Sequence, residues 1–273
     1  SDATLTRSGA QVLGEPAAGY LAHTGYAALP KAPYRYQEML GVIWRENPSC
    51  YLQDGEQAVL MAALMETDNA GRPLIDAWIN RSGLSAEAWL EKLFEATVIP
   101  FYHLLCRYGV ALIAHGQNVT LVMKDYVPQR ILLKDFQGDM RLVDEDFPQA
   151  ESLPKQVKAV TARLSADYII HDLQTGNFVT VLRFISRLTL QCGVNETRFY
   201  QILALVLHRY MAAHPDLAAR FAKFDLFKPQ IIRVILNPVK LTFSEHDGGS
   251  RMLPNYVTDL DNPLFLASRE SAQ

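Results

Sequence analysis

The chain has 273 residues, of which 49% are hydrophobic and 20% are charged, and its formal net charge is −3. This length allows one or two domains with a large core, and the charge excludes a general nucleic-acid binder, because no basic surplus is present to neutralise phosphates. No apolar run is long enough to span a bilayer and no signal peptide is indicated, so we expect a cytoplasmic protein without a membrane partner.

In chain order, the sequence predicts an α+β protein. Residues 9–30 are expected to be irregular or to contain strands. Tyr36 to Arg45 is expected to open a helix that Asn47-Pro48 stops. Gln57 to Glu66 has apolar residues at helical spacing, which predicts a second helix.

The clearest helix is predicted from Ser85 to Tyr108. Ser85 can cap its N-terminus and apolar residues recur at helical spacing, while Pro100 is expected to kink or divide it. Residues 154–233 are expected to be rich in helix, and Asn195 is expected to start one of these helices.

The stretch from Gly109 to Arg141 carries the candidate chemistry. Val119 to Met123 and Ile131 to Leu133 are predicted to form two strands, with Tyr126 to Gln129 as the hairpin turn. Polar groups follow an apolar strand on each side of this hairpin, so they can converge on one point in space. The sequence therefore predicts an antiparallel sheet with a polar site at its strand ends.

The residue types at these ends suit a nucleotide phosphate and its metal. Mg²⁺ takes hard oxygen ligands and usually only one or two from protein, and Asp135 and the side-chain carbonyl of Asn118 can supply them. His115 can donate to a phosphate oxygen or to charge that develops during group transfer. The structural alternative is that Gln117 and Asn118 form a turn, His115 is a packed histidine and Asp135 is a cap.

Two other functions stay open on these residues alone. An Asn followed downstream by an Asp is also how protein kinases hold their metals, which favours a kinase-like phosphotransferase. Against it, no Gly-rich loop paired with a strand lysine precedes the site. A non-catalytic ligand-binding module is the remaining alternative.

The motif His115-Gly-Gln-Asn118, followed by Lys134-Asp-Phe-Gln-Gly-Asp139, resembles the NRPS-independent siderophore synthetases, the aerobactin-synthetase (IucA/IucC) family, and in particular their FhuF-like C-terminal region. The resemblance covers nearly the whole chain. It extends to Tyr34-Arg-Tyr36, Leu40 to Pro48, Lys228 to Arg233 and Asn262-Pro-Leu264.

The resemblance implies a hand-like fold, with residues 1–150 as a palm-like part and residues 151–273 as a helix-rich, thumb-like part. It implies a homodimeric ligase that uses ATP and Mg²⁺ to adenylate a carboxylate, of citrate or a succinyl-hydroxamate, and condenses it with an amine. By the same resemblance, His115, Gln117, Asn118 and Asp135 contact nucleotide and metal, with His115 as the catalytic candidate. Lys228 and Arg233 face the carboxylate substrate.

The chain departs from the family pattern in two places. Many relatives have a Glu two residues before the motif His, where this chain has Ile113, and the Ser/Thr/Arg-rich ATP-binding segments have no equivalent in residues 1–44. We therefore expect the chain to be the C-terminal half of a longer synthetase and to be inactive alone.

The cysteines argue against a ferric-siderophore reductase of the FhuF type. Such an enzyme needs closely spaced cysteines near its C-terminus to hold a [2Fe–2S] cluster. Cys50, Cys106 and Cys192 are far apart, and residues 193–273 contain none. Their odd number and wide spacing instead fit a reducing compartment.

Overall fold

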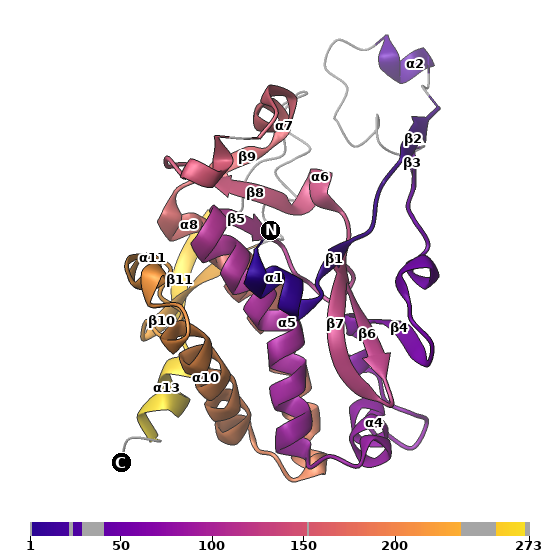
Figure 1. Ribbon diagram of the computed structural model, residues 1–273, viewed down its shortest axis with the longest axis vertical. Helices are drawn as coiled ribbons and strands as arrows, with labels where there is room; N and C mark the ends of the chain where they lie inside the picture. The colour runs from indigo at the N-terminus through magenta and orange to yellow at the C-terminus, as the bar shows by residue number, and fades with distance from the viewer. Residues whose placement is uncertain (1, 22–23, 29–40, 152, 236–254, 271–273) are drawn as a thin grey trace.

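The structure is a computed structural model, and it describes residues 2–21, 24–28, 41–151, 153–235 and 255–270. A long central helix, α5, has a sheet on one side and a second long helix, α10, on the other (Figure 1). The described residues mix helices and strands, which confirms the predicted α+β class.

Helix α5 (Ala86–Tyr108) begins and ends where its sequence signals predict. Ser85 Oγ accepts a hydrogen bond from Ala88 N at 3.2 Å, and Gly109 ends the helix in the left-handed conformation at φ 65°. Most of its residues are buried, because the helix contacts neighbours on several sides. Pro100 lies inside the helix, which continues past it, so Pro100 does not divide the helix.

The main sheet has four strands in the order β1 (Gln11–Val12), β7 (Val127–Leu133), β6 (Val119–Lys124), β4 (Glu56–Leu60). The β4–β6 and β6–β7 pairs are antiparallel, and only β1 joins in parallel. This confirms the predicted hairpin and a largely antiparallel sheet, on which α5 packs.

The hairpin turn lies at Asp125-Tyr126, not over Tyr126 to Gln129 as predicted. Both turn residues have positive φ, 50° and 64°, which is the conformation that two-residue hairpin loops require. Pro128 had suggested a turn but lies in β7, opposite Met123 at an irregularity of the ladder, where a proline is tolerated.

Two helix predictions were wrong. Gln57 to Glu66 instead forms strand β4 and then a 3-10 helix, η2 (Met61–Met65). Gly41–Trp44, within the helix predicted from Tyr36 to Arg45, forms strand β3, which pairs with β2 (Ala17–Tyr20); residues 36–40 lie outside the described residues. Apolar spacing was ambiguous here, and pairing with another strand decided the outcome.

A smaller sheet adjoins the ends of the hairpin. Its order is β5 (Val110–Leu112), β8 (Met140–Val143), β9 (Ala162–Leu164), with β5–β8 antiparallel and β8–β9 parallel. A single helical turn, α6 (Phe136–Asp139), connects β7 of the main sheet to β8. This connection brings the two polar segments of the predicted site together.

The chain after β9 is rich in helix, as predicted. Helix α8 (Ala166–Leu173) continues into a π-helix, η4 (Gln174–Leu182), and Asn195 caps α10 (Glu196–Ala212) as expected, its side chain accepting from Arg198 N at 2.8 Å. The remaining elements are α1 (Ala3–Ser8), α2 (Thr24–Ala27), η1 (Pro48–Tyr51), α4 (Leu74–Ser82), η3 (Pro148–Ala150), α7 (Lys155–Val160), α9 (Arg183–Leu188), η5 (Thr189–Cys192), η6 (Pro215–Leu217), α11 (Ala218–Lys223), β10 (Gln230–Ile235), β11 (Asn255–Asp261) and α13 (Pro263–Glu270).

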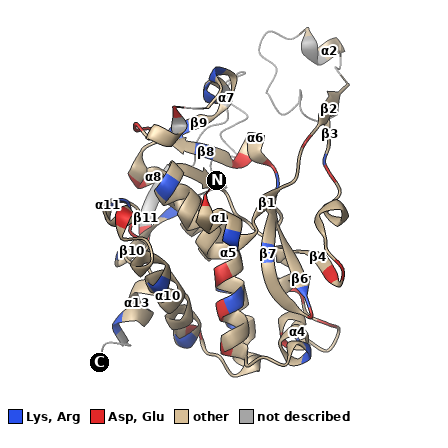
Figure 2. Cartoon of the chain, viewed as in Figure 1, with Lys and Arg blue, Asp and Glu red and all other residues tan. Residues whose placement is uncertain are grey.

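One buried apolar cluster extends through both halves of the chain, from Met61 to Ala267. Phe94 of α5 and Phe199 of α10 meet edge to face at its centre, with ring centroids 5.0 Å apart. Acidic and basic residues both lie along α5 (Figure 2), and Arg198 of α10 pairs with Glu87 of α5 at 2.7 Å. No described helix is long and apolar enough to cross a membrane.

Candidate functional site

The loop between β5 and β6 holds the motif His115-Gly-Gln-Asn118 in a tight turn. Asn118 N donates to His115 O at 2.9 Å, and Ile113 N donates to Asp139 O at the same distance. Gly116 lies against η2: an added Cβ would be 3.0 Å from Ala62 Cα, and Ala62 N donates to Gly116 O at 3.0 Å. Glycine is therefore required for this close backbone approach.

His115 and Asn118 converge on the carboxylate of Asp139. Asn118 Nδ2 donates to Asp139 Oδ2 at 2.6 Å, and His115 Nε2 lies 3.6 Å from the same oxygen. The side chain of His115 is 33% exposed whereas Asn118 is buried. The imidazole is therefore held from behind and reachable from solvent, the arrangement that a group acting on a bound substrate needs.

Asp139 is ionised at neutral pH despite its burial. Burial by itself would raise the pKa of this carboxyl, but the nearby imidazole of His115, the hydrogen bond from Asn118 and the charge of Arg141 lower the pKa below its ordinary value. An anionic Asp139 can orient the imidazole of His115.

A second buried acid lies behind Arg141. Arg141 Nη1 is 3.4 Å from Asp172 Oδ2 of α8, and the side chain of Asp172 is fully buried. Burial raises the pKa of Asp172 to about 7, an effect that Arg141 only partly offsets. Arg141 thus lies between two carboxyl groups, Asp139 and Asp172.

Asp135 lies at the other end of the α6 turn, in the left-handed conformation with φ 67°. Its backbone N–H donates to Glu15 Oε1 at 3.0 Å, and Arg45 Nε donates to the same oxygen at 2.9 Å. Burial and the nearby charge of Arg45 lower the pKa of Lys134. Asp135 therefore belongs to a second polar group, with Glu15, Arg45 and Lys134, at the opposite end of α6 from Asp139.

The other predicted residues have fewer contacts. The side chain of Gln117 is exposed, and its backbone N–H donates to His115 Nδ1 at 3.3 Å. Lys228 Nζ lies 3.9 Å from Asp167 Oδ1, with both side chains more than half exposed. Arg233 is exposed at a bulge between the paired residues Ile232 and Val234 of β10. Among the described residues, neither Lys228 nor Arg233 forms a hydrogen bond or an ion pair with His115 or Asp139.

Asp139 and Arg141 were not chosen from the sequence. The available signal was the four-residue run Met140-Arg141-Leu142-Val143, which forms β8 and places Asp139 at a strand end beside β5. Within the described residues, no group of three or more His, Cys, Asp or Glu side chains is arranged to hold a metal.

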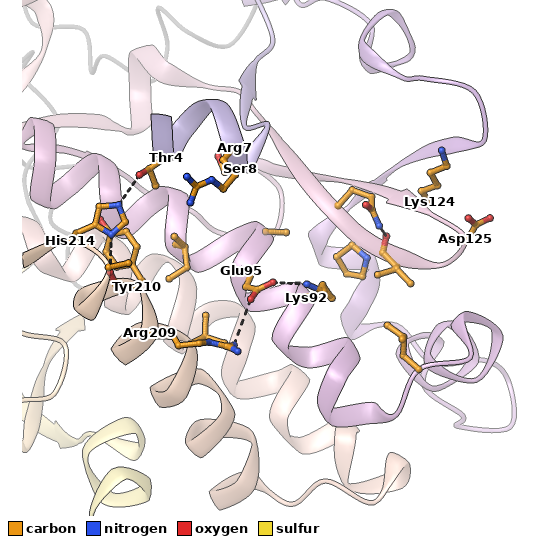
Figure 3. A pocket seen from close by; sticks show the side chains of 18 residues that line it. Thr4, Arg7, Ser8, Lys92, Glu95, Lys124, Asp125, Arg209, Tyr210 and His214 are labelled. Carbon is orange, nitrogen blue, oxygen red and sulfur yellow. Dashed lines mark hydrogen bonds and ion pairs between the residues drawn. The ribbon is translucent and has the colours of Figure 1, made fainter. Parts of the chain in front are cut away.

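A separate cavity of about 810 Å³ lies between α1, α5, the β6–β7 hairpin and α10 (Figure 3). Its wall carries Arg7, Lys92 and Arg209, and Glu95 pairs with both Lys92 and Arg209 at 2.9 and 3.6 Å. None of the predicted site residues lines it. The cavity meets the hairpin at its turn, whereas His115 precedes the far end of β6.

Comparison with known proteins assigns the family. The family model described as "IucA / IucC family" matches residues 1–66. The family model described as "Ferric iron reductase FhuF-like transporter" matches residues 87–250. The chain is 68% identical to an aerobactin synthase of Escherichia coli over 270 residues, which are 99% of this chain and 47% of that protein. The chain belongs to the IucA/IucC family of NRPS-independent siderophore synthetases.

Solved structures of this family share the fold. The aerobactin synthetase IucC of a hypervirulent Klebsiella pneumoniae pathotype matches with a TM-score of 0.84 and 63% identity, over 98% of this chain and 46% of that one. ATP-bound IucA of the same pathotype matches with a TM-score of 0.70 at 17% identity, over 96% of this chain and 45% of that one, and shows the fold alone. The chain spans about half the length of the relatives it matches.

Proposed function

We propose that this chain is part of an ATP-dependent ligase of siderophore biosynthesis, to which it contributes the group of His115, Asn118 and Asp139. The observation that carries the proposal is the convergence of a solvent-accessible His115 and a buried Asn118 on one ionised carboxylate. It occurs in a chain 68% identical to an aerobactin synthase.

The residues present suit a nucleotide and Mg²⁺. The amide nitrogen of Asn118 already donates to Asp139 and Ile113, so its carbonyl oxygen is the atom left for a ligand. Asp135 adds a carboxylate, and we assign Asn118 and Asp135 as the metal contacts. Two oxygen ligands match the small protein share that Mg²⁺ takes beside phosphate oxygens and water. The metal would neutralise phosphate charge.

In this proposal the reaction has two steps. A carboxylate oxygen of citrate or of a succinyl-hydroxamate attacks the α-phosphorus of ATP, and pyrophosphate leaves. An amine then attacks the acyl-adenylate carbonyl, the amide bond forms and AMP leaves. The chain acts by positioning and by stabilising developing negative charge: His115 donates toward that charge, and Asp139 holds the imidazole.

The remaining predicted residues take supporting roles. Gln117 is exposed beside His115 and is assigned to the nucleotide. Lys228 and Arg233 are exposed cations and are assigned to the carboxylate substrate. Their positions on the β10 side of the molecule require the substrate, or a movement of this side, to bridge the distance to His115.

We also propose a homodimer. Val42, Ile43 and Trp44 of β3 are about half exposed, at 47%, 47% and 54%, and contiguous exposed apolar side chains mark interaction surfaces. Sedimentation equilibrium of the full-length synthetase should give twice the monomer mass, and a monomer at micromolar concentration would reject the dimer.

The deciding experiment compares this chain with a version extended to the length of its relatives. ATP–Mg²⁺ binding is measured by calorimetry, and the nucleotide product is identified after adding citrate or a succinyl-hydroxamate with a diamine. We expect AMP from the extended version alone. ADP would indicate a phosphotransferase, and binding without turnover would indicate a binding module. AMP formation by the 273-residue chain alone would contradict the proposal that the extended version is needed for the reaction.

A further inference from the structure

The segment behind the His115 loop is a π-helix, η4, which spans nine residues from Gln174 to Leu182. π-Helical turns are rare and often occur at functional sites. This one follows α8 directly, and its Gly176 and Asn177 face the loop that carries His115.

Gly176 allows the closest approach of the two segments. A Cβ at this position would lie 3.1 Å from Ile113 Cγ2 and 3.2 Å from Ala114 N. These distances are tighter than an ordinary side-chain contact, so a larger residue would require Ile113 or Ala114 to shift. The backbone of the loop is thus packed directly against the π-helix.

Asn177 adds a specific polar contact. It is fully buried, and its Nδ2 donates to Ala114 O at 3.0 Å, the carbonyl directly before His115. Its Oδ1 is buried and finds no hydrogen-bond donor among the described residues. A buried amide with an unpaired oxygen costs stability that leucine of similar size would not, so its benefit lies in fixing Ala114.

The same helical segment also reaches the other side of the site. Asp172 of α8 contacts Arg141, which follows Asp139 by two residues. One continuous helical segment therefore contacts both strands that deliver the His115–Asp139 pair, through Asn177 on one side and Asp172 on the other.

We propose that Asn177, together with Gly176, is a positioning residue that sets the orientation of His115 toward Asp139. The proposal rests on the proposed function in taking His115 as the catalytic group. Asn177 touches no reacting atom. It fixes the carbonyl of Ala114, and the position of this carbonyl determines where the next residue, His115, directs its imidazole.

The test is nuclear magnetic resonance of the histidine rings and asparagine amides in this chain, which requires no nucleotide. The His115 signal is assigned with His115→Gln. Asn177→Leu is compared with Asn262→Leu. Asn262 is a suitable control because it is also buried and its Nδ2 also donates to backbone carbonyl oxygens, Leu226 O and Lys228 O at 2.8 and 2.7 Å. We expect Asn177→Leu alone to shift the His115 ring and Asn118 amide signals.

His115 and Asn118 signals that stay unchanged in Asn177→Leu, or that shift equally in Asn177→Leu and Asn262→Leu, would overturn the positioning role. If Asn177→Leu does not fold, Gly176→Ala is used instead. Its added methyl group presses on Ile113 and Ala114, and the side-chain amide of Asn177 is kept. Displaced His115 signals support the proposal, and unchanged signals reject it. Turnover is then measured in the extended synthetase. Shifted His115 signals without any AMP formation in the unmodified enzyme would reject the proposed function and leave the positioning intact.

Discussion

His115 and Asn118 both approach the same oxygen atom, Oδ2, of Asp139. This contact separates the role of Asp139 from that of Asp135, the other carboxylate near the motif. Asp139 is occupied on its inner side and orients the imidazole. Asp135, at the opposite end of α6, uses its backbone rather than its side chain for the contact with Glu15. The two acids should therefore respond differently to the same substitution.

Asp139→Asn should lower AMP formation by the extended synthetase by about 10- to 100-fold, the usual effect of losing a residue that orients a functional histidine. The variant keeps the shape of the side chain but removes the negative charge that His115 faces. Asp144→Asn is the control, because Asp144 is 67% exposed and pairs only loosely with Arg163. Equal rates for both variants would remove Asp139 from the site.

Asp135→Asn should abolish the Mg²⁺-dependent part of nucleotide binding with little change in stability. Asparagine tolerates the left-handed backbone at this position, whereas alanine would add strain of about 1 kcal/mol. Calorimetry with and without Mg²⁺, together with a thermal melt, separates the two effects. An unchanged affinity for ATP–Mg²⁺ would exclude Asp135 as a metal contact.

Asp172 makes stability depend on pH. Its pKa rises from 3.8 to about 7 on folding, so the unfolded chain releases this proton at lower pH than the folded one. The stabilisation is complete below pH 3.8 and is lost as the pH rises to about 7. His171 acts in the opposite direction, because burial lowers the pKa of its imidazole to about 4.

The contribution of Asp172 is isolated by difference. The free energy of unfolding of the unmodified chain, minus that of Asp172→Asn, should fall between about pH 4 and about pH 8. His171 Nε2 lies 3.3 Å from Asp172 Oδ1, so the two groups are coupled, and the same comparison is repeated with His171→Gln in both proteins. Urea titrations at several pH values provide the measurement, and a difference independent of pH would show that Asp172 titrates normally.

At the scale of elements, the sequence predicts what local signals control. Helices α5 and α10 begin at Ser85 and Asn195 because these side chains cap the first turn. Strands β3 and β4 were predicted as helices because their register depends on β2 and β6, which no local pattern encodes. The same limit applied to Asp139, whose role depends on β8 pairing with β5 across the loop.

The end of α5 offers a test of the junction between helix and site. Gly109→Ala should destabilise the protein more than Gly83→Ala, the same change at the end of α4. Both glycines are left-handed, at φ 65° and 72°, and each substitution carries a backbone cost of about 1–2 kcal/mol. Only at Gly109 would the new Cβ lie 3.0 Å from ring carbons of Phe147, while nothing lies within 4 Å at Gly83. Equal melting temperatures for Gly109→Ala and Gly83→Ala would show that the ring of Phe147 moves aside at no cost in stability.

At the scale of the whole molecule, the two predicted parts, residues 1–150 and 151–273, share one core. The Phe94–Phe199 contact joins α5 of the first part to α10 of the second, and Tyr102 donates to Phe224 O at 3.0 Å across the same boundary. The site is likewise composite, since Asn177 of the second part contacts Ala114, which precedes His115, and Asp172 contacts Arg141, which follows Asp139 by two residues. We therefore expect the described parts to unfold together.

Phe199→Ala tests this coupling, because all three tryptophans, Trp44, Trp78 and Trp89, lie in residues 1–150. Removing the buried ring should cost about 3–5 kcal/mol and lower the melting temperature by roughly 6–20 °C. If the core is shared, tryptophan fluorescence and far-ultraviolet circular dichroism should show the same lowered midpoint, although the substitution lies in the other part. A fluorescence midpoint that stays at its original temperature while the helical signal melts earlier would show two independent domains divided near residue 150.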